Sequence, residues 1–121
     1  MSSAMPVPVE IKLRTASRVL EVVFDDGARF TLPFEYLRVF SPSAEVKGHG
    51  GGEGLLVTGK ESVGIHAVEP IGQYALRLSF DDGHDTGLYS FSLLYALGRD
   101  HAANWARYRA RCAAAGQPRQ V

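Results

Sequence analysis

The sequence has little cysteine, no net charge and no long apolar run. Its single cysteine, Cys112, excludes an internal disulfide and any zinc or iron–sulfur site that one chain builds mainly from thiolates. Thirteen Lys and Arg balance thirteen Asp and Glu, so the chain lacks the overall positive field that draws proteins to nucleic acids or anionic membranes. No stretch approaches the ~20 apolar residues that span a bilayer, and no signal peptide is recognisable. We therefore expect a cytoplasmic protein with neither a membrane anchor nor a nucleic acid partner.

What the sequence does contain is typical of a single globular domain. It has 121 residues, of which 45% are hydrophobic and 21% charged, an ordinary composition for a chain that buries one core. We expect this domain to cover residues 8–116, between a flexible N-terminus at 1–7 and a flexible tail at 117–121.

Apolar and polar residues alternate in two groups of segments, and this pattern predicts strands. The first group of predicted strands is 9–15, 18–24 and 28–32, and a short helix is predicted after it at 33–39. The second group of predicted strands is 65–69, 74–80 and 84–89, and an apolar segment compatible with a helix follows it at 91–97.

One pattern occurs twice. The string Phe-Asp-Asp-Gly at 24–27 returns at 80–83, and at the same offset Leu32 corresponds to Leu88 and Leu37 to Leu93. The glycine of each string takes a positive φ angle at little cost, as a hairpin turn requires. We therefore predict an α+β fold: a small antiparallel β-sheet from two hairpin-plus-helix units, with helices on one face and a C-terminal helix.

The C-terminal helix is expected to start after Asp100, a good N-cap residue, and to end near Gly116. Trp105, Tyr108 and Cys112 are spaced to share one face, where Cys112 serves as a small hydrophobic residue. The basic residues of this helix and the following tail are Arg107, Arg109, Arg111 and Arg119. They form a solvated face or contact RNA or an acidic partner, and a solvated face is the commoner arrangement.

The stretch 41–64 between the two units is long for a connection, and it holds five glycines from Gly48 to Gly54. Such a loop is often functional or mobile. Residues 54–60 match the spacing of a phosphate-binding loop, but Glu61 stands where that loop needs a Ser or Thr for magnesium. We therefore expect a flexible or ligand-covering loop and no nucleotide site.

His84 is the strongest candidate for a metal ligand. It follows the second turn and stands close to Asp82 and Asp85, while His49 and Glu45 in the long loop are further candidates. Imidazole and carboxylate groups suit a single iron or zinc ion. The alternative is a structural histidine that hydrogen-bonds within its own turn. No serine has the surroundings of a catalytic nucleophile.

Three parts of the chain together resemble a known family. They are Leu-Pro-Phe-Glu-Tyr-Leu-Arg at 32–38 with the residues that follow to Val46, Gly-Ile at 64–65 with Val-Glu-Pro at 68–70, and Phe-Asp-Asp-Gly-His-Asp-Thr-Gly-Leu-Tyr at 80–89. These strings resemble the small bacterial proteins of the domain of unknown function 971. That domain is similar to the N-terminal domain of gamma-butyrobetaine hydroxylase, and the resemblance covers about residues 8 to 112.

The resemblance bears on two possible metal sites, a structural zinc site and a catalytic iron site. The hydroxylase domain holds a structural zinc through three cysteines and a histidine that corresponds to His84. Here Ser41, Ser43 and Val46 stand at the cysteine positions, so we expect that zinc site to be absent, because neither a hydroxyl nor an isopropyl group replaces a thiolate. The catalytic iron and 2-oxoglutarate of the hydroxylase belong to a separate barrel domain. Related domains also occur beside iron–sulfur carrier ATPases, which implies a protein partner such as an iron–sulfur carrier or an oxidoreductase.

These observations leave three hypotheses. The first is a non-catalytic binding or adaptor module, linked to metal or iron–sulfur handling, that engages a protein partner or a metal centre through the 41–54 loop beside the His84 turn. The second is a metal-binding accessory domain, or a subunit of an oxidoreductase, that binds iron or zinc through His84 with Asp82, Asp85 or His49. The third is a homo-oligomer formed through an exposed sheet edge. Catalysis by this chain alone is not expected.

Overall fold

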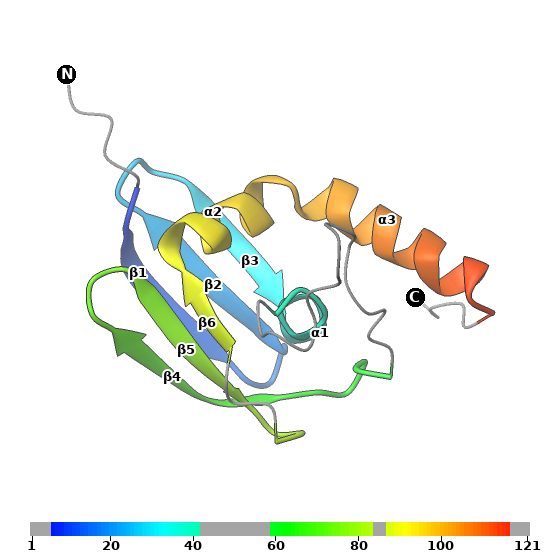
Figure 1. Ribbon diagram of the computed structural model, residues 1–121. Helices are drawn as coiled ribbons and strands as arrows, with labels where there is room; N and C mark the ends of the chain where they lie inside the picture. The colour runs from blue at the N-terminus through cyan, green and yellow to red at the C-terminus, as the bar shows by residue number, and fades with distance from the viewer. Residues whose placement is uncertain (1–5, 42–58, 84–86, 117–121) are drawn as a thin grey trace.

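The computed structural model describes residues 6–41, 59–83 and 87–116, and it has the α+β fold predicted from the sequence (Figure 1). Its elements in chain order are β1 (Pro8–Arg14), β2 (Val19–Phe24), β3 (Arg29–Pro33), α1 (Phe34–Val39), β4 (Ile65–Ile71), β5 (Ala75–Phe80), β6 (Gly87–Ser90), α2 (Phe91–Arg99) and α3 (His101–Ala114). Each lies within a few residues of the place that the sequence pattern indicates.

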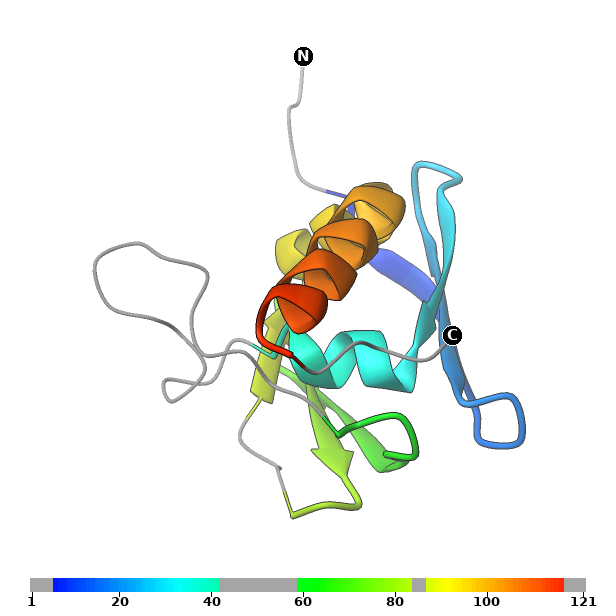
Figure 2. The same ribbon diagram turned by 90° about the vertical axis from the view of Figure 1, so that its right-hand side faces the viewer.

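The strands form two antiparallel sheets of three strands, β1-β2-β3 and β4-β5-β6, rather than one continuous sheet. Both sheets contribute their apolar face to the same core, together with α1 and α2. Figure 2 shows the two sheets at an angle to each other, with the three helices lying together within that angle. In this arrangement each short sheet has a partner layer for its apolar face, which a small sheet needs in order to be stable.

The middle strand of each sheet carries most of the core. In β2 and β5 every second side chain is fully buried, because successive side chains of a strand point to opposite faces. This buried set, at most 1% exposed, is Leu20, Val22, Phe24, Leu76, Leu78 and Phe80. The period-two pattern in the sequence therefore marks the residues on which the fold depends.

The two units of the sequence repeat fold in the same way. The order β1-β2-β3-α1 is repeated as β4-β5-β6-α2, with the same antiparallel pairing. The first strand of each unit also has an irregularity in its pairing at the equivalent place, between Pro8 and Glu10 in β1 and between Ile65 and Ala67 in β4. The repeat thus extends to these first strands, which the sequence comparison did not reach.

The second unit is one residue longer than the first after its turn. Residues beyond the turn therefore do not correspond at the constant sequence offset that matches the two Phe-Asp-Asp-Gly strings. Both turns keep a glycine at positive φ, 91° at Gly27 and 90° at Gly83. The residue equivalent to the buried Leu32 is Tyr89, since the two pair with equivalent positions of the middle strands. Leu88 is 42% exposed. A one-residue shift moves a side chain to the other face of a strand, so Leu88 points away from the core.

The same shift applies to the helices. Leu94, rather than Leu93, corresponds to Leu37, and both Leu37 and Leu94 are fully buried. The helix α2 begins after Ser90, whose hydroxyl accepts a hydrogen bond from the backbone amide of Leu93 at 3.0 Å. The backbone of Leu93 therefore contributes to the cap, while Leu94 takes the core position.

Asp100 precedes α3 as predicted, but its side chain does not cap the helix. Its carboxylate instead accepts two hydrogen bonds from Arg99, at 3.1 and 2.9 Å, because a charged guanidinium is a stronger donor than a backbone amide. Within α3, Tyr108 and Cys112 are buried as expected, and Gly116 follows the helix with a φ of 79°. No helix within the three described ranges is long and apolar enough to cross a membrane.

Candidate functional site

Asp82, in the turn between β5 and β6, is held by two cations. Its Oδ2 atom accepts a hydrogen bond from Arg38 Nε at 3.0 Å and another from Lys60 Nζ at 2.6 Å. The three side chains are between 13% and 23% exposed. Arg38 comes from α1 and Lys60 from the segment before β4, so the ion pairs join three parts of the chain. No sequence pattern pointed to these partners, which lie 44 and 22 residues from Asp82.

This arrangement bears on the predicted metal site. A divalent cation at Asp82 Oδ2 would meet two positive charges already within 3.0 Å of that oxygen, and it would have to displace at least one of them. Among the described residues, no group of three or more His, Cys, Asp and Glu side chains could hold a metal ion. His84, Asp85, His49 and Glu45 lie outside the described residues, so the metal site stays a prediction.

Ser41 occupies a position at which the family resemblance places a zinc-binding cysteine in the hydroxylase domain. It is buried, with 3% of its surface exposed, and its hydroxyl hydrogen-bonds to Tyr89. The Tyr89 hydroxyl in turn donates to the Leu37 carbonyl oxygen at 2.5 Å. A buried hydroxyl that is engaged with a phenol does not fit a zinc ligand. Ser43 and Val46, the other two positions, lie outside the described residues.

The buried Tyr89 gives the protein a predictable response to alkaline pH. Burial raises the pKa of Tyr89 from its ordinary value of 10.0, so the native state holds the neutral phenol more firmly than the unfolded chain does. This contribution to stability is complete below about pH 10 and is lost as the pH rises from there toward the folded-state pKa. We expect the urea midpoint of unfolding to fall steeply above about pH 10.

Tyr89→Phe serves as the control for this pH dependence. At pH 7 the variant is expected to be less stable by about 1–2 kcal/mol, because the buried Leu37 carbonyl loses its donor. Above about pH 10 the variant should lose stability less steeply than the wild type. Some loss should remain, since burial also raises the pKa of Tyr36 and Tyr108. An alkaline loss as steep in the variant as in the wild type would contradict the assignment to Tyr89.

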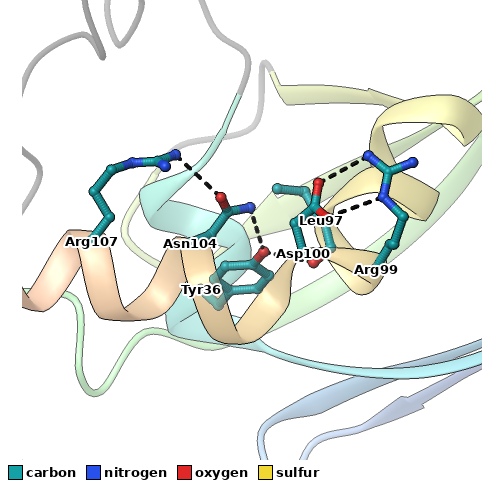
Figure 3. Close-up of polar contacts among 6 residues, drawn as sticks. All are labelled: Tyr36, Leu97, Arg99, Asp100, Asn104 and Arg107. Atoms are coloured by element: carbon teal, nitrogen blue, oxygen red, sulfur yellow. Dashed lines mark hydrogen bonds and ion pairs between the residues drawn. The ribbon is translucent and has the colours of Figure 1, made fainter.

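A separate set of contacts fixes α3 on the fold (Figure 3). The Tyr36 hydroxyl donates to the Leu97 carbonyl oxygen at 2.6 Å and accepts a hydrogen bond from Asn104 Nδ2 at 3.0 Å. The ring of His101 stacks on that of Tyr36, with 4.3 Å between centroids. Arg107 donates to the side-chain oxygen of Asn104 at 3.2 Å. One tyrosine of α1 therefore connects the end of α2 with the beginning of α3 and holds the angle between the two helices.

An open groove of about 610 Å³ lies beside the junction of these helices, and we call it the α2–α3 groove. It is lined by Gly98, Arg99, His101, Ala102, Trp105, Ala106 and Arg109. The sequence placed Trp105 on the buried face of α3, but the structure leaves it half-buried. Its ring packs against Tyr36 and Tyr108, with centroid distances of 6.1 and 4.9 Å. Part of an aromatic ring is thus held rigidly in a concave surface.

The rim of the α2–α3 groove is positively charged. Arg109 is exposed and forms no hydrogen bond or ion pair within the described part of the chain. Arg99 is paired with Asp100 at 2.9 Å. Burial lowers the pKa of His101 below its ordinary value of 6.5, so its ring is neutral at neutral pH. The uncompensated charge of the groove therefore resides on Arg109.

A smaller cavity of about 250 Å³ lies next to the start of β4. Its lining includes Ser62, His66 and Asp81, which are the residue types of a nucleophile, a base and an acid that orients the base. All three are exposed, and no hydrogen bond joins any two of them in the described structure. Activation of a nucleophile needs such a link, so this cavity holds no assembled catalytic group.

The sequence model of the family described as gamma-butyrobetaine hydroxylase-like, N-terminal, matches residues 11–95. The chain belongs to this family. Two NMR solution structures are 50% and 48% identical to this gamma-butyrobetaine hydroxylase-like domain, with TM-scores of 0.83 and 0.82. The first covers 98% of this chain and 89% of its own, and the second covers 97% and 92%.

A crystal structure of a protein of unknown function from Acidithiobacillus ferrooxidans ATCC 23270 is also similar. It belongs to the domain of unknown function 971 family, is 42% identical with a TM-score of 0.64, and covers 75% of this chain and 91% of its own. A comparison with curated proteins gave no match. The resemblance drawn from the sequence strings is confirmed.

The family match and the candidate sites overlap only in part. The matched range 11–95 begins within β1, includes β2 to β6 and the Asp82 cluster, and ends within α2, before Trp105 and Arg109. The descriptions of the similar structures state no activity. The function of this gamma-butyrobetaine hydroxylase-like domain therefore has to be argued from its own side chains.

Proposed function

We propose that this domain is a non-catalytic adaptor module that binds a protein partner through the α2–α3 groove. The observation that carries the proposal is the groove itself, which has a volume of about 610 Å³ and is lined in part by the Trp105 ring. Tryptophan and arginine are the residue types that most often dominate the binding energy of protein interfaces. Trp105 and Arg109 both line this groove, and Trp105 is already held in place by its aromatic neighbours.

The other polar side chains support binding rather than catalysis. The Asp82 carboxylate serves two cations of the fold, and the buried hydroxyls of Tyr36 and Tyr89 donate to backbone carbonyl oxygens. These groups already act as structural partners. The family resemblance suggests the class of partner, an iron–sulfur carrier or an oxidoreductase, and a role linked to metal or cluster handling is part of the proposal.

A homo-oligomer joined at a sheet edge has less support. The outer strands β1 and β4 each contain an irregularity in their pairing, and β1 also carries the charged residues Glu10, Lys12 and Arg14. Bulges and charged side chains on an edge strand discourage pairing with another chain. The β1 and β4 edges are therefore poor sites for pairing with a second copy, and we infer that the partner is a different protein that binds at the groove.

Site-specific photo-crosslinking tests the adaptor function. Ala102 and Ala103 are neighbouring exposed alanines of α3, but only Ala102 lines the groove, because successive side chains of a helix point about 100° apart. With p-benzoylphenylalanine at Ala102, we expect one dominant protein adduct in the source cells, and with the probe at Ala103 much less of it. The captured protein, once purified, should bind the untagged domain and change the emission of Trp105.

The outcome that would refute the adaptor function is equally specific. Adducts that are absent, or equally abundant from Ala102 and Ala103, would refute the adaptor function proposed for the groove. A captured protein that fails to bind when purified would lead to the same conclusion. Trp105 is the single tryptophan of the chain, so the domain's own tryptophan emission comes from this groove.

A further inference from the structure

We propose that the α2–α3 groove binds an acidic segment of the partner, with a large apolar side chain of that segment on Trp105 and a carboxylate on Arg109. This inference rests on the proposed adaptor function and names the chemistry of the occupant. It is carried by three features of the described residues: the distribution of charge along α3, the composition of the groove floor and the rigidity of the tryptophan.

Positive charge is concentrated on α3 although the chain as a whole is neutral. The helix contains Arg107, Arg109 and Arg111 and no acidic residue, whereas Lys and Arg balance Asp and Glu in the full sequence. A neutral chain with one basic helix presents a local field that attracts an acidic partner. Within the groove, Arg109 has no partner among the described residues, so its guanidinium can donate two parallel hydrogen bonds to a carboxylate.

The floor of the groove suits an apolar side chain. Ala102 and Ala106 are small and exposed, and they leave room beside the half-buried Trp105. His101 is stacked on Tyr36, and burial lowers its pKa, so it adds no charge to the floor at neutral pH. An apolar floor with a cationic rim matches a segment in which a leucine or an aromatic residue lies a few positions from Asp or Glu.

Trp105 offers this floor without a large entropic cost. Its ring is fixed by Tyr36 at 6.1 Å and by Tyr108 at 4.9 Å between centroids, and Tyr36 is itself fixed by hydrogen bonds to α2 and α3. A contact surface that is ordered before binding loses little conformational freedom when it is occupied. The groove is therefore already shaped for its ligand in the unbound domain.

A single-stranded nucleic acid fits the groove less well. Binding along a phosphate backbone needs several uncompensated cations in a row. In the groove, however, Arg99 is neutralised by Asp100, and Arg109 alone remains. One cation beside an apolar floor matches a carboxylate next to an apolar side chain better than it matches a chain of phosphates. A polyuridine oligonucleotide is therefore included in the test as the competing ligand.

The experiment is a selection from a random peptide library displayed on phage, with the untagged domain as the target. We expect the enriched peptides to carry Asp or Glu within a few residues of Leu, Phe or Trp. A synthetic peptide of the enriched sequence should change Trp105 fluorescence on titration. Arg109→Glu should weaken its binding about tenfold or more, because it replaces a charge-assisted hydrogen bond by repulsion.

Arg29→Glu is the matched control, with the same change of charge at an exposed arginine that lies outside the groove. It should weaken peptide binding by less than about threefold, through the long-range field alone. Melting temperatures of both variants establish that they fold. A further expected result is that Arg109→Glu in the selection enriches peptides with Lys or Arg in place of the acidic residues.

Three results would overturn the inference. They are enriched peptides without acidic residues, equal weakening by Arg109→Glu and Arg29→Glu, and polyuridine that binds with the same dependence on Arg109 and displaces the peptide. The adaptor function would survive the first two of these if the crosslinked partner at Ala102 still binds. If no partner is captured but acidic peptides bind with the expected dependence, the chemistry of the groove is established and the adaptor function is not.

Discussion

Gly98→Ala is expected to lower the free energy of unfolding by about 1–3 kcal/mol, even though alanine is the better helix former. Gly98 lies near the end of α2, close to the ring of Phe30 on β3. A Cβ atom built at Gly98 would lie 2.2 Å from Cγ of that ring and within 2.6 Å of both Cδ atoms. The intrinsic helix preference for alanine over glycine is only about 1 kcal/mol, so the steric conflict decides the sign.

The conflict is severe because Phe30 has little room to move. Its ring packs edge-on against Phe24 and Tyr95, with centroid distances of 5.8 and 5.3 Å. Phe24 is itself 1% exposed. To accept a methyl group at Gly98, either this aromatic cluster or the α2 backbone has to shift, and close-packed interiors resist both changes. A shift of α2 would also alter the α2–α3 groove, which Gly98 lines.

Urea denaturation of a double-mutant cycle tests this explanation. In a Phe30→Leu background the ring is gone, so Gly98→Ala should cost at least about 1 kcal/mol less than it does in the wild type. Because the helix preference for alanine then acts with less opposition, the substitution could even become stabilising. Equal costs of Gly98→Ala in the two backgrounds would show that the Phe30 ring is not the obstacle.

Asp82→Asn is expected to destabilise the protein by about 2 kcal/mol. The amide removes the charge that compensates Arg38 and Lys60, while asparagine before glycine keeps the preference for a turn. Arg38 is affected most, because its side chain is 13% exposed. Its Nη1 atom is already buried without a hydrogen-bond partner. A partly buried cation that loses its counterion keeps the cost of desolvation without the compensating attraction.

The internal repeat provides the control for this substitution. Asp26 takes the equivalent place in the first turn, but its partners are neutral. The Tyr95 hydroxyl donates to its Oδ2 atom at 2.7 Å and the Ala28 amide to its Oδ1 atom at 2.9 Å. Asp26→Asn keeps one carbonyl oxygen as the acceptor for the Ala28 amide, and its NH2 group can donate to the Tyr95 hydroxyl oxygen. It should therefore shift the urea midpoint much less than Asp82→Asn. Equal shifts would mean that ion pairing at Asp82 is not the source of the effect.

Elemental analysis tests the predicted metal site. If Asp82 serves Arg38 and Lys60 rather than a metal ion, protein purified without a histidine tag or chelator should contain no stoichiometric iron, zinc or manganese. Addition of EDTA should then leave the urea midpoint of the wild type unchanged. Near-stoichiometric metal that disappears in His84→Ala would establish the metal-binding function instead, with Asp85 and His49 as the next residues to substitute.

Much of the fold follows from patterns among neighbouring residues. Alternation located the strands because burial of one face selects apolar residues at every second position, and glycines marked the two turns because positive φ favours glycine. The constant offset of the repeat was wrong at Leu88 and Leu93. Which residue after a turn enters the core depends on the side chains that meet there, and that information is absent from the local pattern.

For the candidate sites, sequence patterns identified residue types but little of their arrangement. They showed Asp82 beside His84 and a basic last helix. The tertiary structure decided that Arg38 and Lys60 meet Asp82, and that the angle fixed by Tyr36 leaves Trp105 half-buried in a groove. The physical reason is that local conformation depends on neighbouring residues, whereas contacts between distant residues depend on how the whole core packs.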